Sequence, residues 1–275
     1  MHLGPVAAIA AGGGNAYAVR PGRLVEIDGR TGKIVARAQV GAAPAGVAVG
    51  FGAIWVANGR GDLSRRYRGR DTVSGYDLRT RRTQTIPVPA PEDVATGRGS
   101  VWVLSGAGPR VYRIDPATRK VVATVRLSGG SPADLAAGPS GAWVNSRLGA
   151  GDRSLVIRVD RSGRRIAATI RPRRLTVSIS VGGTDVWATY FGTILRIDPR
   201  TNRIANSFKV PNATFTAAGA TSAWANSPRE AVTRLTSSGP GKVIPIGRPV
   251  EAMALDHALL WVLESDGTLL EIRVA

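Results

Sequence analysis

The sequence predicts an all-β fold, a seven-bladed β-propeller of four-stranded antiparallel blades, from three features that recur together. Short Val-rich apolar runs are separated by Gly, Pro and Asp, which is typical of strands joined by tight turns. An aromatic residue recurs at the same point of every unit, and an apolar or aromatic residue followed by Asp recurs after it in most units. The repeat is about 40 residues long, the period expected of a propeller blade.

The aromatic marker is the more regular of the two. It occurs at Tyr17, Trp55, Trp102, Trp143, Trp187, Trp224 and Trp261. The Asp marker closes the third predicted strand at Asp28, Asp77, Asp115, Asp160 and Asp198, and degrades to Thr236 and Arg273 in the last two units. A two-layer β-sandwich also uses many short strands but does not explain an aromatic in every fourth strand. We expect each ring to pack between neighbouring sheets.

The third unit shows the four-strand pattern most clearly. Its apolar runs end at Gly97, span residues 101–104 and 111–114, and finish with residues 121–127. The same reading applied along the chain predicts blades at residues 6–40, 44–88, 92–127, 132–170, 176–210, 214–246 and 250–275, as one domain over residues 1–275. The last blade has three predicted strands. Either the N-terminus closes it with a short stub, or the chain is a piece of a longer protein, which we favour.

Composition limits the chemistry. The chain of 275 residues has no Cys, which excludes disulfides, a thiol nucleophile and a thiolate metal site. Its net charge of +18 permits binding to nucleic acid, anionic membrane or acidic polysaccharide. Only four of the 37 basic residues are Lys, so a GC-rich genome is an equally good explanation. No apolar run reaches the roughly 18 residues of a membrane span. No basic residue precedes the apolar stretch 5–18, so we do not read it as a signal peptide.

Loop lengths predict the binding face. From the aromatic to the end of the third strand, the second unit has 22 residues and the fourth 17, against 11 to 13 in the others. These insertions, 58–74 and 145–155, emerge on the face that also carries the blade-to-blade connections. Loop variation on one face of a rigid scaffold is typical of a binding surface. Neutral drift of surface loops is the alternative.

Arginines and aromatic rings in these loops are the candidate contacts, because guanidinium groups bind phosphate and carboxylate and Tyr190 and Phe191 offer rings for stacking. The predicted partner-binding residues are Asn58, Arg60, Arg65, Arg66, Tyr67, Arg68, Arg70, Arg147, Arg153, Tyr190 and Arg229. Arginines also gather on the opposite face, at residues 79–82 and 161–165, which weakens a reading as a specific nucleic-acid binder.

Three carboxylates stand where an innermost strand enters the sheet, beside the predicted central channel. They are Asp93, Asp134 and Glu251, with Asp93 and Asp134 on adjacent blades. Oxygen ligands of this kind hold Ca²⁺ or Mg²⁺, so the three residues are the candidate metal ligands. Solvated carboxylates at a water-filled channel mouth are the alternative.

The unit from Val101 to Gly138, VWVLSGAGPRVYRIDPATRKVVATVRLSGGSPADLAAG, resembles the YVTN-type (YncE-like) bacterial β-propeller repeat, and so do VGAAPAGVAVGFGAIWVANG and ILRIDPRTNRIANSFKV. The resemblance covers essentially the whole chain. It implies a propeller fold, an extracytoplasmic location, and a sensing or binding role. The related streptogramin lyases share the Gly-x-x-Trp pattern but use Mg²⁺ with a catalytic His, for which no counterpart is found here. In lactonase-type propellers a metal lies at the channel mouth, a part that only the three carboxylates could play.

Together these observations predict a non-enzymatic, monomeric binding or scaffold module that uses the face with loops 58–74 and 145–155. Its partner is a protein or an anionic ligand. One alternative is a metal-dependent lyase or lactonase-like enzyme at the channel mouth. Another is polyanion or nucleic-acid binding through the Arg-rich loops.

Overall fold

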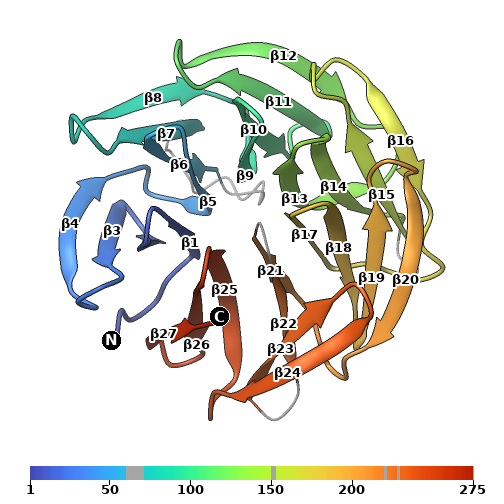
Figure 1. Ribbon diagram of the computed structural model, residues 1–275. Helices are drawn as coiled ribbons and strands as arrows, with labels where there is room; N and C mark the ends of the chain where they lie inside the picture. Colours follow the sequence, from blue (N-terminus) through green and yellow to red (C-terminus); the bar gives the residue numbers. More distant parts are fainter. Residues whose placement is uncertain (60–70, 150–152, 220–221, 228–229, 275) are drawn as a thin grey trace.

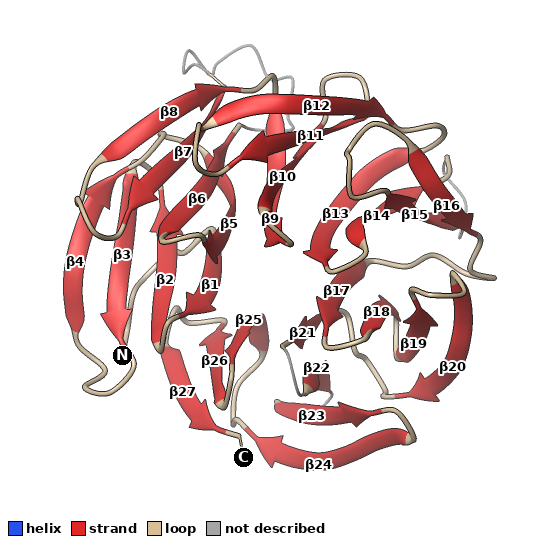
Figure 2. Cartoon of the chain, turned by 45° about the horizontal axis from the view of Figure 1, so that its top comes forward, coloured by secondary structure: helices blue, strands red, loops and turns tan. Residues whose placement is uncertain are grey.

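Seven antiparallel sheets surround a central axis in the computed structural model, which describes residues 1–59, 71–149, 153–219, 222–227 and 230–274 (Figures 1 and 2). Within these residues there are strands and no helix, and none of the described segments could cross a membrane as a helix. Each sheet runs in chain order from an innermost strand at the axis to an outermost strand at the rim. The prediction of a seven-bladed propeller is confirmed.

The first four blades each have four strands. They are β1 (Ala8–Gly12), β2 (Asn15–Arg20), β3 (Arg23–Asp28) and β4 (Ile34–Gln39); β5 (Pro44–Gly50), β6 (Ala53–Asn58), β7 (Thr72–Asp77) and β8 (Thr83–Pro87); β9 (Pro91–Gly97), β10 (Ser100–Ser105), β11 (Arg110–Asp115) and β12 (Lys120–Arg126); and β13 (Ser131–Gly138), β14 (Gly141–Arg147), β15 (Ser154–Val159) and β16 (Ile166–Ile170).

The last three blades hold eleven strands among the described residues. They are β17 (Ser178–Gly182), β18 (Asp185–Tyr190), β19 (Thr193–Asp198) and β20 (Arg203–Lys209); β21 (Thr216–Ala218), β22 (Ala223–Ser227), β23 (Ala231–Thr236) and β24 (Gly239–Pro245); and β25 (Val250–Asp256), β26 (Leu259–Glu264) and β27 (Leu269–Arg273).

The core lies between neighbouring blades. In the second and third blades every residue of the second strand is buried, and five of the six Trp side chains are under 2 % exposed. Trp102 of the third blade packs with Leu135 and Val144 of the fourth, and Trp143 of the fourth packs with Ile179 of the fifth. The rings fill the space between sheets, as the sequence predicted, because a single sheet cannot bury both of its faces.

The Asp marker shapes the turn between the third and fourth strands. Asp77 Oδ1 accepts hydrogen bonds from the backbone N–H of Arg79 at 3.0 Å, and from the N–H and hydroxyl of Thr80 at 2.6 and 2.9 Å. Asp28 and Asp115 hold the same turn in the first and third blades. Each turn ends with a left-handed residue: Gly32, Arg81, Arg119, Gly163 and Asn202.

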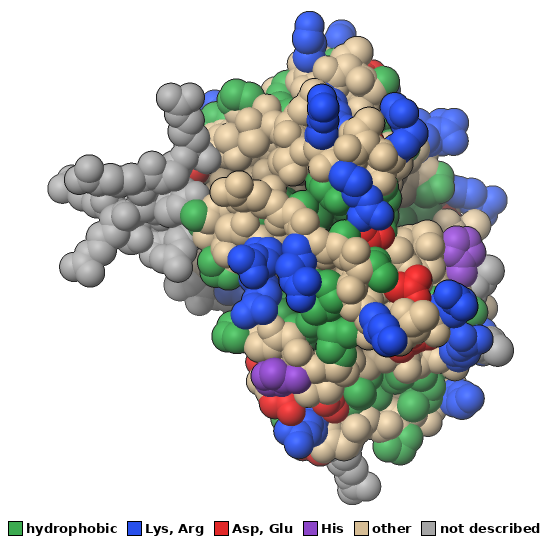
Figure 3. All heavy atoms as spheres, turned by 90° about the vertical axis from the view of Figure 1, so that its left-hand side faces the viewer, with side chains coloured by type: hydrophobic (Ala, Val, Ile, Leu, Met, Phe, Trp, Pro, Cys, Tyr) green, Lys and Arg blue, Asp and Glu red, His purple; other side chains and the backbone are tan. Residues whose placement is uncertain are grey.

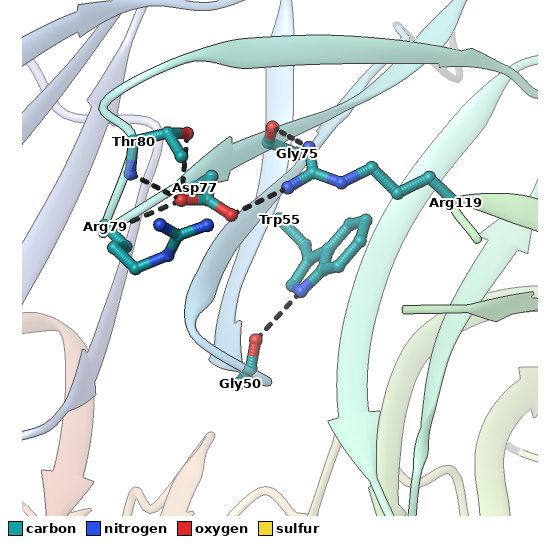
Figure 4. A network of polar contacts seen from close by, with 7 residues as sticks. All are labelled: Gly50, Trp55, Gly75, Asp77, Arg79, Thr80 and Arg119. Atoms are coloured by element: carbon teal, nitrogen blue, oxygen red, sulfur yellow. Dashed lines mark hydrogen bonds and ion pairs between the residues drawn. The ribbon is translucent and has the colours of Figure 1, made fainter. Parts of the chain in front are cut away.

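Where the left-handed residue has a side chain, at Arg81, Arg119 and Asn202, that side chain contacts the preceding blade, as Arg119 shows best (Figure 4). Its Nη1 donates to the Gly75 carbonyl at 2.6 Å, and its Nη2 lies 3.4 Å from Asp77 Oδ2. Its Cζ stands 5.6 Å from the centre of the Trp55 ring, an arrangement that attracts a cation to the ring face. The third blade is thereby tied to the second.

The N-terminus lies beside the last blade (Figure 1). The backbone N–H of Leu3 donates to the Gly267 carbonyl, and that of Leu269 donates to the Met1 carbonyl, both at 2.7 Å. His2 forms a β-bridge with Thr268. The N-terminal stub, one of the two sequence-based alternatives, therefore pairs with the edge of the last blade.

Replacing Arg119 by Ala tests the tie between blades. We expect the free energy of unfolding, measured by urea denaturation, to fall by about 1–3 kcal/mol, because a charged donor to a buried carbonyl is lost. Arg79→Ala is the control, since the Arg79 side chain is exposed and makes no such bond. It should change stability by no more than about 0.5 kcal/mol. Equal losses in the two variants would contradict the tie.

Candidate functional site

The two ends of the propeller differ in what they carry. We call the end with the blade-to-blade connections and the loops between second and third strands the connection face. We call the end with the other hairpin turns, such as 139–140 and 199–202, the turn face. Both predicted insertions start from the connection face. Residues 60–70 and 150–152 of these insertions lie outside the described residues.

Arginines and two aromatic rings gather on the connection face between the fourth and fifth blades. We call them the basic–aromatic cluster: Arg147, Arg153, Arg171, Arg173, Arg174, Tyr190 and Phe191. All five arginines are exposed. The described residues of the segments that carry them, 145–149, 153–155, 171–177 and 190–193, contain no Asp or Glu. The described residues of these segments therefore carry five formal positive charges and no negative one.

Buried hydrogen bonds hold these segments together beneath the surface. The Asn145 amide donates to the Thr176 carbonyl and accepts from the Thr176 hydroxyl, both at 2.7 Å. The Ser154 hydroxyl lies 2.8 Å from that of Thr176 and donates to the Arg174 carbonyl at 3.3 Å. These bonds hold the loop of the fourth blade against the connection to the fifth blade. They thereby fix the backbone positions from which the arginines of both segments extend.

The two rings are held at the edge of the cluster. Arg174 Nη1 donates to the Tyr190 hydroxyl at 3.1 Å, and its Cζ lies 5.6 Å from the centre of the Tyr190 ring. Tyr190 meets Phe191 edge to face, with ring centres 5.8 Å apart and planes at 81°. Phe191 is 62 % exposed, the largest value among the exposed large hydrophobic residues. The Phe191 ring is thus presented to solvent beside the Tyr190 ring.

The turn below Phe191 requires glycine. Gly192 has a φ of +79°, and a Cβ built on it would lie 3.0 Å from the backbone nitrogen of Asn212. Its N–H donates to the Ala213 carbonyl at 3.0 Å, in the connection to the sixth blade. The close approach fixes the direction in which Phe191 leaves the sheet.

The structure places the predicted partner-binding residues in three groups. Arg147, Arg153 and Tyr190 come together in the basic–aromatic cluster. The residues Arg60, Arg65, Arg66, Tyr67, Arg68, Arg70 and Arg229 lie outside the described residues. The assignment of Asn58 to the surface is corrected: its side chain is fully buried, and its amide donates to Ser74 Oγ at 2.9 Å and to the carbonyls of Val56 and Thr72. The Asn58 side chain therefore joins strands and is not exposed at the surface.

The channel carboxylates form a pair that links blades. Asp93 Oδ2 accepts the N–H of Leu135 in the fourth blade at 3.0 Å, and Asp134 Oδ2 accepts that of Ile179 in the fifth at 2.7 Å. Gly46 takes the equivalent place in the second blade, where a Cβ would lie 2.5 Å from Asp93 Oδ1. Each carboxylate thus satisfies a backbone donor of the next innermost strand.

Burial shifts the titration of both carboxylates of this pair. Burial raises the pKa of Asp134 to about 6. Burial, and then the charge of Asp134, raise the pKa of Asp93 well above its ordinary value.

Glu251 does not complete a metal site with the pair, because no three His, Cys, Asp or Glu side chains are grouped for a metal ion among the described residues. Glu251 is exposed, on the innermost strand of the seventh blade. The structure brings together two of the three predicted ligands, and binding of Ca²⁺ or Mg²⁺ there stays a prediction.

Sequence reasoning missed the hollows of the turn face. Three of them adjoin the turn 183–184 of the fifth blade, and the most enclosed lies between the fourth and fifth blades. Loop length gave no sign of them, since these turns are short. The signal that the sequence offered was an Arg on the third strand, at the position that pairs with the Trp of the second strand. Arg158 and Arg196 are the two examples.

The positive charge is not confined to the basic–aromatic cluster, since Arg79, Arg161 and Arg164 are exposed elsewhere. The side seen in Figure 3 shows Lys and Arg groups scattered among apolar and acidic ones rather than gathered in one patch. Part of the charge is structural, because Arg119 and Arg158 lie over buried Trp rings at 5.6 and 5.7 Å. Net charge alone therefore does not mark a single binding footprint.

Comparisons with known proteins support the fold. No family model matches the chain, and no curated protein matches its sequence. Similar solved structures include hydrazine synthase from Kuenenia stuttgartiensis (14 % identity, 98 % of this chain and 96 % of that chain, TM-score 0.77) and a chain of the mitotic checkpoint complex (13 %, 100 % and 92 %, 0.74). BamB from Moraxella catarrhalis is also similar (14 %, 99 % and 86 %, 0.62). At these identities the likeness shows the β-propeller fold alone, which is consistent with a binding or scaffold module.

The carboxylate pair predicts an unusual pH dependence. Its raised pKa means that the folded protein binds these protons more tightly than the unfolded chain, where an Asp titrates near about 3.9. The resulting stabilisation is complete below about pH 4 and is lost as the pH rises through about 6, the pKa of Asp134. Asp93→Asn removes the repulsion. Its thermal midpoint should rise relative to the wild type between about pH 4 and 7.

Asp266→Asn is the control, because the pKa of Asp266 is shifted in the direction opposite to that of the channel pair. Bonds from Thr268, first its backbone N–H, lower the pKa of Asp266, so this carboxylate stabilises the folded state above its unfolded pKa and the effect is lost on acidification. Its replacement should lower the midpoint at pH 7 and not in acid. If Asp93→Asn instead lowered the midpoint equally at pH 4 and pH 7, the repulsion within the pair would be refuted.

Proposed function

We propose that this chain is a non-enzymatic binding module that docks an acidic segment of a partner protein on the basic–aromatic cluster. The observation that carries the proposal is the exposed Phe191 ring, 62 % accessible, which meets the Tyr190 ring that Arg174 contacts, on the face that carries four further exposed arginines of the cluster. Aromatic side chains and Arg are enriched at protein interfaces and supply most of their hot spots. A matching partner presents Asp or Glu to the arginines and an apolar side chain to Phe191.

Preorganisation supports this surface over the rest of the connection face. The Arg174–Tyr190 hydrogen bond and the Gly192 turn fix the rings before a partner arrives, so less conformational entropy is lost on binding. We also propose that the chain belongs to the YVTN-type family and that it is located outside the cytoplasm, as the resemblance of its repeats implies.

A protein assembly contains a chain of similar fold, since one of the similar solved structures is a chain of the mitotic checkpoint complex.

Selection from a random peptide display library tests the proposal. We expect peptides that combine Asp or Glu with an aromatic or Leu residue to be enriched on the wild-type protein. Phe191→Ala and Arg173→Gln should each weaken the enriched peptides by roughly tenfold or more, the effect expected of a hot-spot residue. Phe51→Ala is the control, because Phe51 is also exposed, at 47 %, but lies on the turn face.

Two outcomes would contradict this function. Enriched peptides that lack acidic residues, or that bind the Phe191→Ala variant as well as the wild type, would exclude the cluster as the docking site. A short DNA duplex provides the second test. If its affinity falls steeply with salt concentration and is the same for the wild type and Phe191→Ala, the polyanion alternative is favoured, because phosphate contacts release counterions.

A further inference from the structure

A hollow of about 580 Å³ on the turn face lies between the fourth and fifth blades, away from the basic–aromatic cluster. Its walls are the turns at 139–140, 183–185 and 198–200, together with Arg158, Arg161 and Arg196. Its volume is within the range of about 300–1,000 Å³ typical of small-molecule sites. Most of these groups belong to hairpin turns of fixed geometry.

The charges around this hollow do not balance. Arg196 Nε lies 2.9 Å from Asp185 Oδ1, and Arg200 Nε lies 3.8 Å from Asp198 Oδ1. The nearby Asp160 pairs with Arg165, at 2.9 Å. With these carboxylates each matched by one arginine, Arg158 and Arg161 form no ion pair with a carboxylate of the described residues. The lining of four arginines and two aspartates has a net formal charge of 4 − 2 = +2.

Arg158 is held rigidly at the edge of the hollow. Its Nη1 donates to the Pro199 carbonyl at 2.7 Å and to Asn202 Oδ1 at 2.9 Å, and its Nη2 and Nε donate to the Ser140 carbonyl at 3.1 and 3.2 Å. All these acceptors are neutral. Its Cζ lies 5.7 Å from the centre of the Trp143 ring. A half-buried cation is thus fixed by groups that do not cancel its charge.

Arg161 adds a second cation beside it. It is exposed, it lines the same hollow, and no carboxylate in the described part of the chain forms an ion pair with it. Burial lowers the pKa of Arg158, and the charge of Arg161 lowers it further, whereas Asp160 opposes the shift. Two guanidinium groups that repel one another across a concave surface are stabilised by an anion placed between them.

We propose that this hollow binds the phosphate group of a small molecule. A phosphate monoester carries about −1.5 to −2 charges on one group at neutral pH, which matches the excess of two positive charges, whereas a carboxylate carries one. Its three terminal oxygens suit the forked donors of Arg161, and the uncancelled charge of Arg158 lies beside them. The hollow is larger than the anion alone, so it has room for an organic remainder between the turns 139–140 and 198–200.

Titration of the whole protein with inorganic phosphate and with glycerol phosphate tests the proposal, by calorimetry and by thermal midpoint at constant ionic strength. A ligand that binds only the folded state raises the midpoint. Arg161→Gln should raise the dissociation constant roughly tenfold, because one charge-assisted contact is lost. Arg164→Gln is the matched control: Arg164 lies in the same turn and is exposed, but does not line the hollow. It should bind as the wild type does.

The outcomes separate the sources of the phosphate group. Tighter binding of glycerol phosphate identifies an organic phosphate as the ligand, and equal binding of both identifies free phosphate. Three results would overturn the proposal: no binding of either phosphate by the wild type, equal loss in Arg161→Gln and Arg164→Gln, or equal binding of succinate. Failure here leaves docking on the connection face untouched, because the two sites share no residue.

Discussion

The buried aromatic ring in each blade is the constraint on which the rest of the structure depends. Each ring lies on the second strand and fills the space to the next sheet, and a residue from a third strand or from a turn must cover the ring. In the second blade the residue opposite Trp55 on the third strand is Gly75, which has no side chain, and Arg119 of the third blade covers the Trp55 ring instead. In the fourth blade Arg158 covers Trp143 and binds Asn202 of the fifth. The third blade has Arg113 opposite Trp102, so the next turn needs Gly163, where a Cβ would lie 2.9 Å from Arg113 Cβ.

These arrangements give the arginines two different roles. One set covers aromatic rings and joins blades through carbonyls and carboxylates, as Arg119 and Arg158 do. The other set stands on the two faces and is available to ligands, as in the basic–aromatic cluster and at Arg161. A net charge of +18 is therefore the sum of a structural and a surface contribution. Because the ring of blades is held by the first set, the loops and turns can differ between blades without loss of the fold.

The sequence was sufficient to predict the fold because its signals are local and repeated. The aromatic and Asp markers fix strand position and turn type in each blade, whatever the neighbours are. The site was predicted only in part. Arg147, Arg153 and Tyr190 were found because loop length and residue type are visible in sequence. The burial of Asn58 was missed because it depends on how Gly41 and Ser74 approach it, where a Cβ on Gly41 would lie 2.5 Å from the Asn58 side chain.

The carboxylates show the same limit. Position in the repeat placed Asp93 and Asp134 beside the channel and close to each other. Sequence could not show that their oxygens accept backbone N–H groups of the next blade, since those bonds depend on the spacing between sheets. The turn-face hollow was missed for a related reason: its four arginines come from separate elements of two blades, and only their pairing with Asp185 and Asp198 reveals which charges are left over.

Site-by-site modification of arginine is the measurement that tests the division of roles most directly. Phenylglyoxal attacks accessible guanidinium groups, and mass spectrometry of the native protein gives a rate for each. The account predicts fast reaction at Arg147, Arg153, Arg161 and Arg173, which are exposed, and slow reaction at Arg119 and Arg158, whose donors are held by carbonyls of neighbouring blades. Reaction of Arg119 and Arg158 as fast as that of Arg161 would contradict it, because the cations over the Trp rings would then not be holding the blades together.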